Sequence, residues 1–108
     1  MADELDRIIA EVRTLVRELE RVNIRVRQAI LFGSRARGDH TQTSDIDIAL
    51  VSDDFEGIRL RDKSRLNPAL IHHDPRLEIH PYRTDEFNPE SRWFVEEVLK
   101  TGVPIPLH

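Results

Sequence analysis

Two apolar runs joined by a short polar connection constrain the fold of this chain most strongly. Residues 26–32 alternate apolar side chains and predict a first strand, and residues 45–51 predict a second. Only twelve residues, 33–44, separate the two runs, which is the lower limit for a parallel crossover. We therefore expect an antiparallel pair, in which the end of the first strand lies beside the start of the second.

The connection begins with a Gly-Ser corner. Gly33 should end the first strand, and Ser34 should cap a helical turn over 35–38. Backbone N–H groups at such a corner can contact a phosphate. Gly33 and Ser34 are therefore candidate phosphate-binding residues. Arg35 and Arg37 follow directly, and arginine suits bidentate contacts to phosphate.

Two carboxylates stand at the head of the second strand. Alternation places Asp45 and Asp47 on the same side of that strand, with Cα atoms about 7 Å apart. Carboxylates so placed can hold one or two divalent cations through hard oxygen ligands. Metal ions beside a phosphate-binding corner are what nucleotidyl transfer requires.

Three carboxylates suffice to hold the metal ions of nucleotidyl transfer, and the third can also accept the proton of the attacking hydroxyl group. Glu78 is the best candidate, because it lies within an otherwise apolar predicted strand over 76–82. The alternative is an outward-facing residue on a half-exposed strand. His80, a second polar residue on the same face, keeps that alternative open.

The remaining patterns predict three helices and an edge segment. A long apolar stripe predicts the first helix, and a weaker pattern predicts a second that Pro68 should break or kink. The last helix, capped by Asn88, should end before Gly102. The helices are expected over 3–22, 58–72 and 89–101, with Trp93, Phe94, Val98 and Leu99 buried in the last, and the edge segment over 103–108.

Composition excludes several classes of protein. A chain of 108 residues predicts one domain, and no apolar run approaches the roughly 20 residues of a membrane span. The absence of cysteine excludes disulfides and thiolate metal sites. A net charge of −4 does not favour nucleic acid as a direct partner. The acidic start, unlike the basic start of a secretory signal, favours the cytoplasm.

The corner and the carboxylates together carry a family resemblance. Gly33-Ser34, ten residues, and then Asp-Ile-Asp-Ile over 45–48 resembles the signature of the DNA polymerase β-like nucleotidyltransferase superfamily. The string GSRARGDHTQTSDIDIAL most resembles the minimal nucleotidyltransferases, small prokaryotic proteins of about this size. The resemblance implies one domain over 1–108 of α+β, two-layer class. Its expected architecture is a short mixed sheet of three or four strands packed with about four helices.

The resemblance also implies an activity and a partner. Such proteins bind ATP and Mg²⁺, with two ions expected, and many act as antitoxins that transfer AMP to a tyrosine of a HEPN-domain toxin. By position, Gly33 and Ser34 would hold the triphosphate, with Arg37 as a further candidate for cofactor binding. The metal-binding and catalytic carboxylates would be Asp45, Asp47 and Glu78. The third position is often Asp in the family, so the longer Glu78 is a departure.

Two other functions remain open. One is a non-catalytic antitoxin that neutralises its toxin by contact alone, although the intact Asp pair argues against it. The other is an aminoglycoside-type enzyme that modifies small molecules, for which a dimer would have to complete the acceptor pocket. Because so short a chain has no room for an acceptor domain, the acceptor site of an enzyme must be shared with another molecule, and a homo- or hetero-oligomer is expected.

Several side chains have a plain structural interpretation beside a functional one. His72 and His73 are adjacent to Asp74, but a solvated helix end is favoured over a metal site. His40 is interpreted as a loop histidine. Tyr82 is assigned equally to core packing or to stacking on adenine, whereas core packing is preferred for the two aromatic residues at 93–94.

Overall fold

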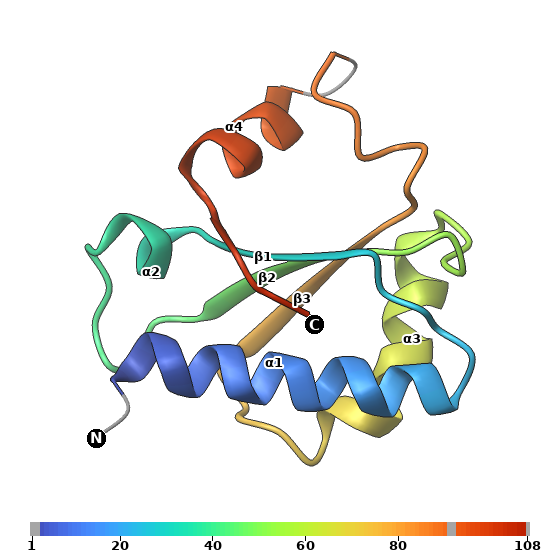
Figure 1. Cartoon of the computed structure of the whole chain (residues 1–108), viewed down its shortest axis with the longest axis horizontal. Helices are drawn as coiled ribbons and strands as arrows, with labels where there is room; N and C mark the ends of the chain where they lie inside the picture. Colours follow the sequence, from blue (N-terminus) through green and yellow to red (C-terminus); the bar gives the residue numbers. More distant parts are fainter. Residues whose placement is uncertain (1–2, 91–92, 108) are drawn as a thin grey trace.

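A computed structural model describes residues 3–90 and 93–107 of the chain. The helices and strands alternate along most of it (Figure 1). In chain order they are α1 (Glu4–Arg21), β1 (Gln28–Phe32), α2 (Ser34–Arg37), β2 (Ile46–Val51), α3 (Arg59–Leu70), β3 (Leu77–Tyr82), α4 (Trp93–Thr101) and β4 (Val103–Pro104).

The strands form one mixed sheet in the order β3-β2-β1-β4. β1 and β2 are antiparallel, as the short connection predicts, and Phe32 lies opposite Asp47. β3 runs parallel to β2, with Glu78 opposite Asp47. β4 pairs antiparallel with β1 at the other edge, which confirms an edge segment at the C-terminal end. The four-stranded mixed sheet with four helices confirms the expected α+β class.

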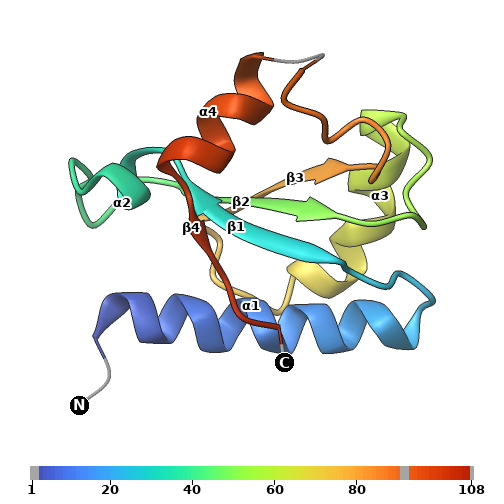
Figure 2. The same cartoon turned by 45° about the horizontal axis from the view of Figure 1, so that its top comes forward.

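Helices cover both faces of this sheet, whereas the expected two-layer arrangement has helices on one face only. α1 and α3 lie against one face and α4 against the other, which Figure 2 shows with α1 below the sheet and α4 above it. Ile46 and Ile48 of β2 pack into the core on the α1 side. Because alternate strand residues face opposite ways, Asp47 and Glu78 lie on the α4 side.

α1 has the sequence signals of a stable helix. The Asp3 side chain caps it by accepting a hydrogen bond from the Asp6 backbone N–H at 2.8 Å. Its apolar stripe is buried in the core, and only the ends of the predicted stripe, Leu5 and Val22, are exposed. The buried residues of the stripe are Ile8, Val12, Leu15, Val16 and Leu19.

Several predicted features differ from the structure. β1 and β2 each begin later than predicted, so Asp45 precedes β2. α3 continues through Pro68 to Leu70, so the predicted break is wrong. A proline there removes one hydrogen bond of a helix that ends within one further turn, and this position limits its effect.

α4 buries a narrower face than predicted. Val95 and Val98, three residues apart, are buried between α4 and the sheet, which confirms the predicted burial of Val98. The predicted burial of Trp93, Phe94 and Leu99 is wrong, because these residues are 76%, 38% and 46% exposed. The helix begins at Trp93, whereas residues 89–90 form a turn in which Asn88 accepts the Glu90 N–H at 2.9 Å. The predicted helical residues 91–92 lie outside the described part.

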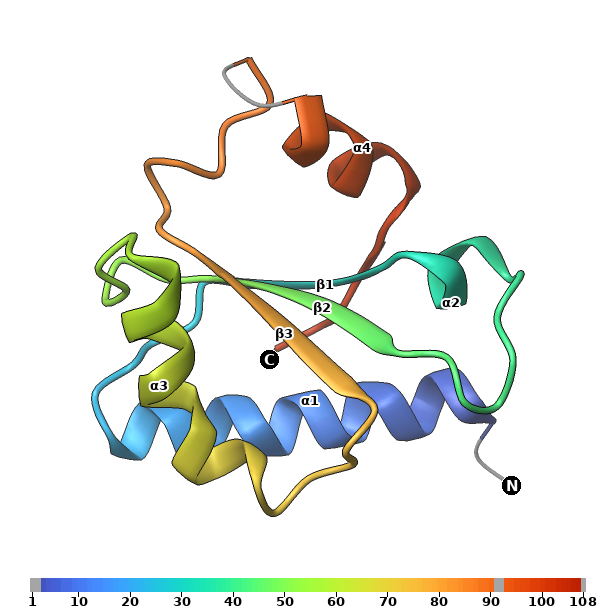
Figure 3. The same cartoon turned by 180° about the vertical axis from the view of Figure 1, so that it is seen from behind.

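The connection from α3 to β3 is fixed by an arginine–carboxylate pair. Arg76 Nη2 lies 2.6 Å from Asp74 Oδ2, and Arg76 Nε lies 3.0 Å from Asp74 Oδ1. The Arg76 backbone N–H also donates to Asp74 Oδ1 at 2.9 Å. This turn leads directly into β3, seen from behind in Figure 3. Among the described residues, no helix is long and apolar enough to cross a membrane.

Acid should weaken this turn. Hydrogen bonds from Arg76 hold the pKa of Asp74 at about 2, below its ordinary 3.8. A folded-state pKa below the unfolded value stabilises the fold above about pH 4, and this contribution is lost as the pH falls through about 2. Chemical denaturation at several pH values should therefore show a shallower acid dependence for Asp74→Asn than for wild type. An unchanged slope would show that the pair adds no pH-dependent stability.

Candidate functional site

The Gly-Ser corner forms a tight junction between β1 and α2. Gly33 has φ of 75°, a left-handed conformation that suits glycine, and serves as the N-cap of α2. Ser34 is the first helical residue, so its predicted role as the cap is wrong. The Gly33 carbonyl accepts hydrogen bonds from the backbone N–H groups of Ala36 and Arg37, both at 3.1 Å.

Gly33 and Asp47 are in close contact. A Cβ placed on Gly33 would lie 2.5 Å from Asp47 Oδ2, closer than non-bonded atoms approach. The antiparallel register causes this approach, because Phe32, the residue before Gly33, pairs with Asp47. The structure thus brings together the predicted phosphate corner and one predicted metal ligand.

The second oxygen of Asp47 contacts His80. His80 Nε2 lies 3.1 Å from Asp47 Oδ1, and His80 Nδ1 lies 3.3 Å from Arg59 Nη2. The imidazole also packs edge-on against the Phe32 ring, with centroids 4.9 Å apart. Both the Asp47 and His80 side chains are largely buried. The sequence predicts no role for His80 at this site, although its alternation with Glu78 on β3 is a signal that places it on the same face.

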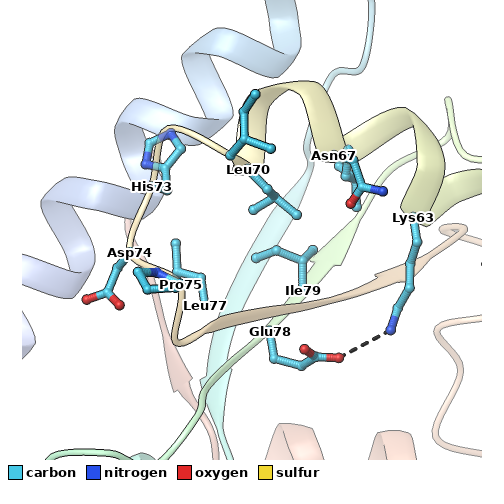
Figure 4. Close-up of a pocket in the computed structure, with 11 residues that line it drawn as sticks. Lys63, Asn67, Leu70, His73, Asp74, Pro75, Leu77, Glu78 and Ile79 are labelled. Atoms are coloured by element: carbon cyan, nitrogen blue, oxygen red, sulfur yellow. Dashed lines mark hydrogen bonds and ion pairs between the residues drawn. The ribbon is translucent and has the colours of Figure 1, made fainter.

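The other two predicted carboxylates are more open. Asp45 is exposed and lies one residue before β2. Glu78 is opposite Asp47, its side chain is 45% exposed, and its Oε1 lies 3.2 Å from Lys63 Nζ. Figure 4 shows the Glu78 carboxylate directed toward Lys63, at the edge of a cavity of about 410 Å³ between α3 and β3.

These residues fit a hard cation in chemistry and in placement on the sheet. Carboxylate oxygens are the ligands that Mg²⁺ prefers, and Asp47 and Glu78 are register partners on one face. The absence of a Cβ on Gly33 allows Asp47 Oδ2 to lie against the backbone of the corner. Within residues 3–90 and 93–107, no three acidic, histidine or cysteine side chains already converge as a metal site. Glu78 would have to leave Lys63 to join Asp47.

Arg35 has a different role from the predicted phosphate contact. Its side chain is 1% exposed and pairs with Glu4 of α1. Its guanidinium donates to three carbonyls of the loop that leads to Asp45: those of Thr41 at 3.2 Å, Gln42 at 3.3 Å and Ser44 at 3.0 Å.

Two more arginines border the same loop. Arg76 donates to the Gln42 carbonyl at 2.7 Å, so the loop is held from two sides. Arg37, in contrast, is exposed and pairs with Asp39 at 3.3 Å, which leaves its predicted role sterically open.

The contacts of the other histidines and of Tyr82 decide between their structural and functional interpretations. The interpretation of His73 as part of a solvated helix end is wrong: its ring is buried, 3.1 Å from both Glu11 and Glu18 of α1. His40 lies in the loop, 3.4 Å from Glu4 Oε2. Tyr82 is buried against Phe87, with ring centroids 5.3 Å apart.

Comparison with known proteins identifies the class. The nucleotidyltransferase domain family matches residues 9–105, and the chain therefore belongs to this family of enzymes. A relative from Methanocaldococcus jannaschii, named a putative protein adenylyltransferase, is 61% identical over 81 residues, covering 72% of this chain and 76% of its own. A crystal structure of a putative nucleotidyltransferase from Sulfolobus solfataricus shares the fold, with a TM-score of 0.61 and 23% identity over 91% of this chain and 78% of that one.

Substitution of Gly33 by Ala should disrupt the site more than its backbone strain explains. The added methyl group would displace the Asp47 carboxylate, and a misplacement of about 1 Å can cost about 100-fold in activity. We expect a loss of this order in nucleotidyl transfer. Binding of Mg²⁺ and a nucleoside triphosphate, followed by calorimetry, should weaken in parallel.

Gly38→Ala provides the matched control. Gly38 also has a left-handed φ, 85°, but a Cβ there would meet nothing within 4 Å. Both variants therefore introduce backbone strain, of about 1–3 kcal/mol, while only Gly33→Ala introduces a collision with Asp47. Equal losses of binding in the two variants would contradict a specific role for the contact between Gly33 and Asp47.

Proposed function

We propose that this protein transfers AMP from Mg²⁺-bound ATP to a hydroxyl group of a partner protein. The observation that carries the proposal is the contact between the Gly33 corner and Asp47, with Glu78 next to Asp47 in the sheet. A corner that could bind phosphate would then lie directly beside candidate ligands for a hard cation, which supports the proposal. The name of the 61% identical relative, a protein adenylyltransferase, supports a protein acceptor and an adenylyl group.

The chain's own residues would divide the work. Asp45 and Asp47 would hold Mg²⁺, and Glu78 would complete the site after release from Lys63. When bound, the ions would neutralise charge on the triphosphate and orient it. The acceptor oxygen would form a bond to the α-phosphorus as the bond to pyrophosphate breaks, and Glu78 would accept the hydroxyl proton.

An exposed aromatic surface beside the site supports a protein acceptor. The rings of Phe32 and Phe94 are in edge-on contact, with centroids 5.7 Å apart, and Phe94 contacts Trp93 at 6.2 Å. Phe32 directly precedes the Gly33 corner, so these rings extend from the corner to the surface of α4. Large exposed aromatic side chains are typical anchors of protein interfaces.

The biological role proposed for this transfer is that of an antitoxin. The resemblance to minimal nucleotidyltransferases indicates a HEPN-domain toxin as the partner and one of its tyrosines as the acceptor. The tyrosine hydroxyl would have to approach the corner past Trp93 and Phe94. The protein would thus neutralise its toxin by covalent modification.

Asp47→Asn tests whether the chemistry depends on the proposed ligand. The change removes the ligand charge at nearly constant volume, so transfer of labelled AMP to the purified partner should fall by about 100-fold or more. Glu78→Gln should also lower it. Asp53→Asn removes the same charge beyond the opposite end of β2 and should leave transfer unchanged.

The same assay separates modification from contact alone. If Asp47→Asn still neutralises the toxin as well as wild type, and wild type adds no label, the enzymatic role is wrong and the contact-only antitoxin is favoured. Labelling of a small-molecule acceptor instead of the partner would favour the aminoglycoside-type activity.

Trp93→Ala tests the surface used by the acceptor. We expect the KM for the partner protein to rise by about 5-fold or more, because truncation of an aromatic anchor at an interface costs over about 1 kcal/mol. Binding of Mg²⁺ and ATP should stay unchanged. Val22→Ala, at an exposed apolar residue beyond the end of α1, is the control. A KM unchanged by the loss of Trp93 would exclude this surface.

A further inference from the structure

Three side chains from three elements form a continuous hydrogen-bonded series that ends at Asp47. Arg59, the first residue of α3, contacts His80 of β3, and His80 contacts Asp47 of β2. The two distances are 3.3 Å from Arg59 Nη2 to His80 Nδ1 and 3.1 Å from His80 Nε2 to Asp47 Oδ1. The series joins the surface of α3 to a proposed metal ligand.

The chemistry of arginine fixes the tautomer of His80. A guanidinium group has only N–H donors and no acceptor, so His80 Nδ1 must accept the hydrogen bond from Arg59. The proton of the neutral ring is then on Nε2, which donates to Asp47 Oδ1. Each contact in the series therefore has one direction, from Arg59 through His80 to Asp47.

The two oxygens of Asp47 consequently differ. Oδ1 accepts the hydrogen bond from His80, while Oδ2 faces the backbone of Gly33. We infer that Arg59 and His80 are positioning residues that hold the Asp47 carboxylate in one orientation, with Oδ2 toward the corner. This inference rests on the proposed function for the role of Asp47 itself.

A relayed contact has an advantage over a direct ion pair. Arginine beside a carboxylate commonly binds both oxygens through parallel hydrogen bonds, as Arg76 does with Asp74. Such a pair at Asp47 would occupy the oxygen needed for a cation. With His80 between them, the Arg59 charge orients the imidazole, and the contact with His80 uses only one of the two Asp47 oxygens, Oδ1.

Packing fixes the ring as well as its hydrogen bonds. The imidazole lies edge-on to Phe32, which is the register partner of Asp47 and the neighbour of Gly33. The His80 side chain is only 17% exposed. A ring so confined cannot turn away from Asp47 without losing its contact with Phe32, and outer-shell groups of this kind commonly determine ligand orientation.

The ¹⁵N NMR shifts of the His80 ring test the tautomer without reference to activity. In the ligand-free full chain, at a pH where free histidine is neutral, the spectrum should show Nε2 protonated and Nδ1 unprotonated. His80→Phe identifies the signal among the 5 histidines. Arg59→Met should shift His80 toward a mixture of tautomers. A proton on Nδ1, or an Arg59→Met spectrum identical to wild type, would overturn the inference.

Matched substitutions test the orientation of Asp47. His80→Phe keeps a ring against Phe32 but removes both hydrogen bonds, and His80→Gln can restore a donor near the Nε2 position. Titration of Mg²⁺ in the presence of a non-hydrolysable ATP analogue should show affinity about 10- to 100-fold weaker for His80→Phe. His80→Gln should recover part of that loss, which a purely structural role of the ring would not produce.

A double-mutant cycle completes the test. If Arg59 acts through His80, Arg59→Met should weaken Mg²⁺ affinity in wild type but have no further effect in the His80→Phe background. Additive losses would overturn the series. Asp47→Asn separates the two proposals: if it abolishes Mg²⁺ binding while His80→Phe does not weaken it, only the positioning role fails. If Asp47→Asn binds Mg²⁺ normally, the proposed function fails.

Discussion

The approach of the Asp47 carboxylate to the Gly33 backbone is the contact on which the rest of the site depends. The antiparallel register of β1 and β2 places the residues side by side, and the absence of a Cβ on Gly33 leaves room for the carboxylate. The parallel pairing of β3 then adds Glu78 and His80 on the same face of the sheet. A register shift of one residue would turn Asp47 into the apolar core on the α1 side.

The sequence predicts the part of this arrangement that local pattern and chain length control. The short connection favours an antiparallel pair over a parallel crossover, so the β1–β2 pair and the meeting of Gly33 with Asp47 could be foreseen. The different functions of Arg35 and Arg37 could not be foreseen, because both are arginines within one motif and the sequence does not distinguish them. Arg35 is held by Glu4, which is distant in sequence, and by the loop carbonyls, whereas Arg37 is exposed and pairs with the nearby Asp39.

α4 and β3 show the same limit in different ways. Helical spacing predicts that α4 has an apolar face, but the orientation of the helix on the sheet determines that Val95 and Val98 form it. Trp93 is thereby left at the surface, next to the site and not within the core. For β3, alternation puts Glu78 and His80 on one face, while their partners on α3 are distant in sequence and emerge only from the tertiary structure.

α3 contacts the two candidate carboxylates, Asp47 and Glu78, in different ways, and this difference affects how a metal site could form. Arg59 and Lys63 are four residues apart, so both lie on the same side of the helix. Lys63 contacts Glu78 directly and would compete with a cation for that carboxylate, whereas Arg59 reaches Asp47 only through His80, which contacts Oδ1 alone. On the proposed function, Asp47 would be oriented before a cation binds, while Glu78 would have to exchange an ammonium group for a metal ion. Since the exposed ion pair at Glu78 is weak, a divalent cation beside a triphosphate can replace it at small cost.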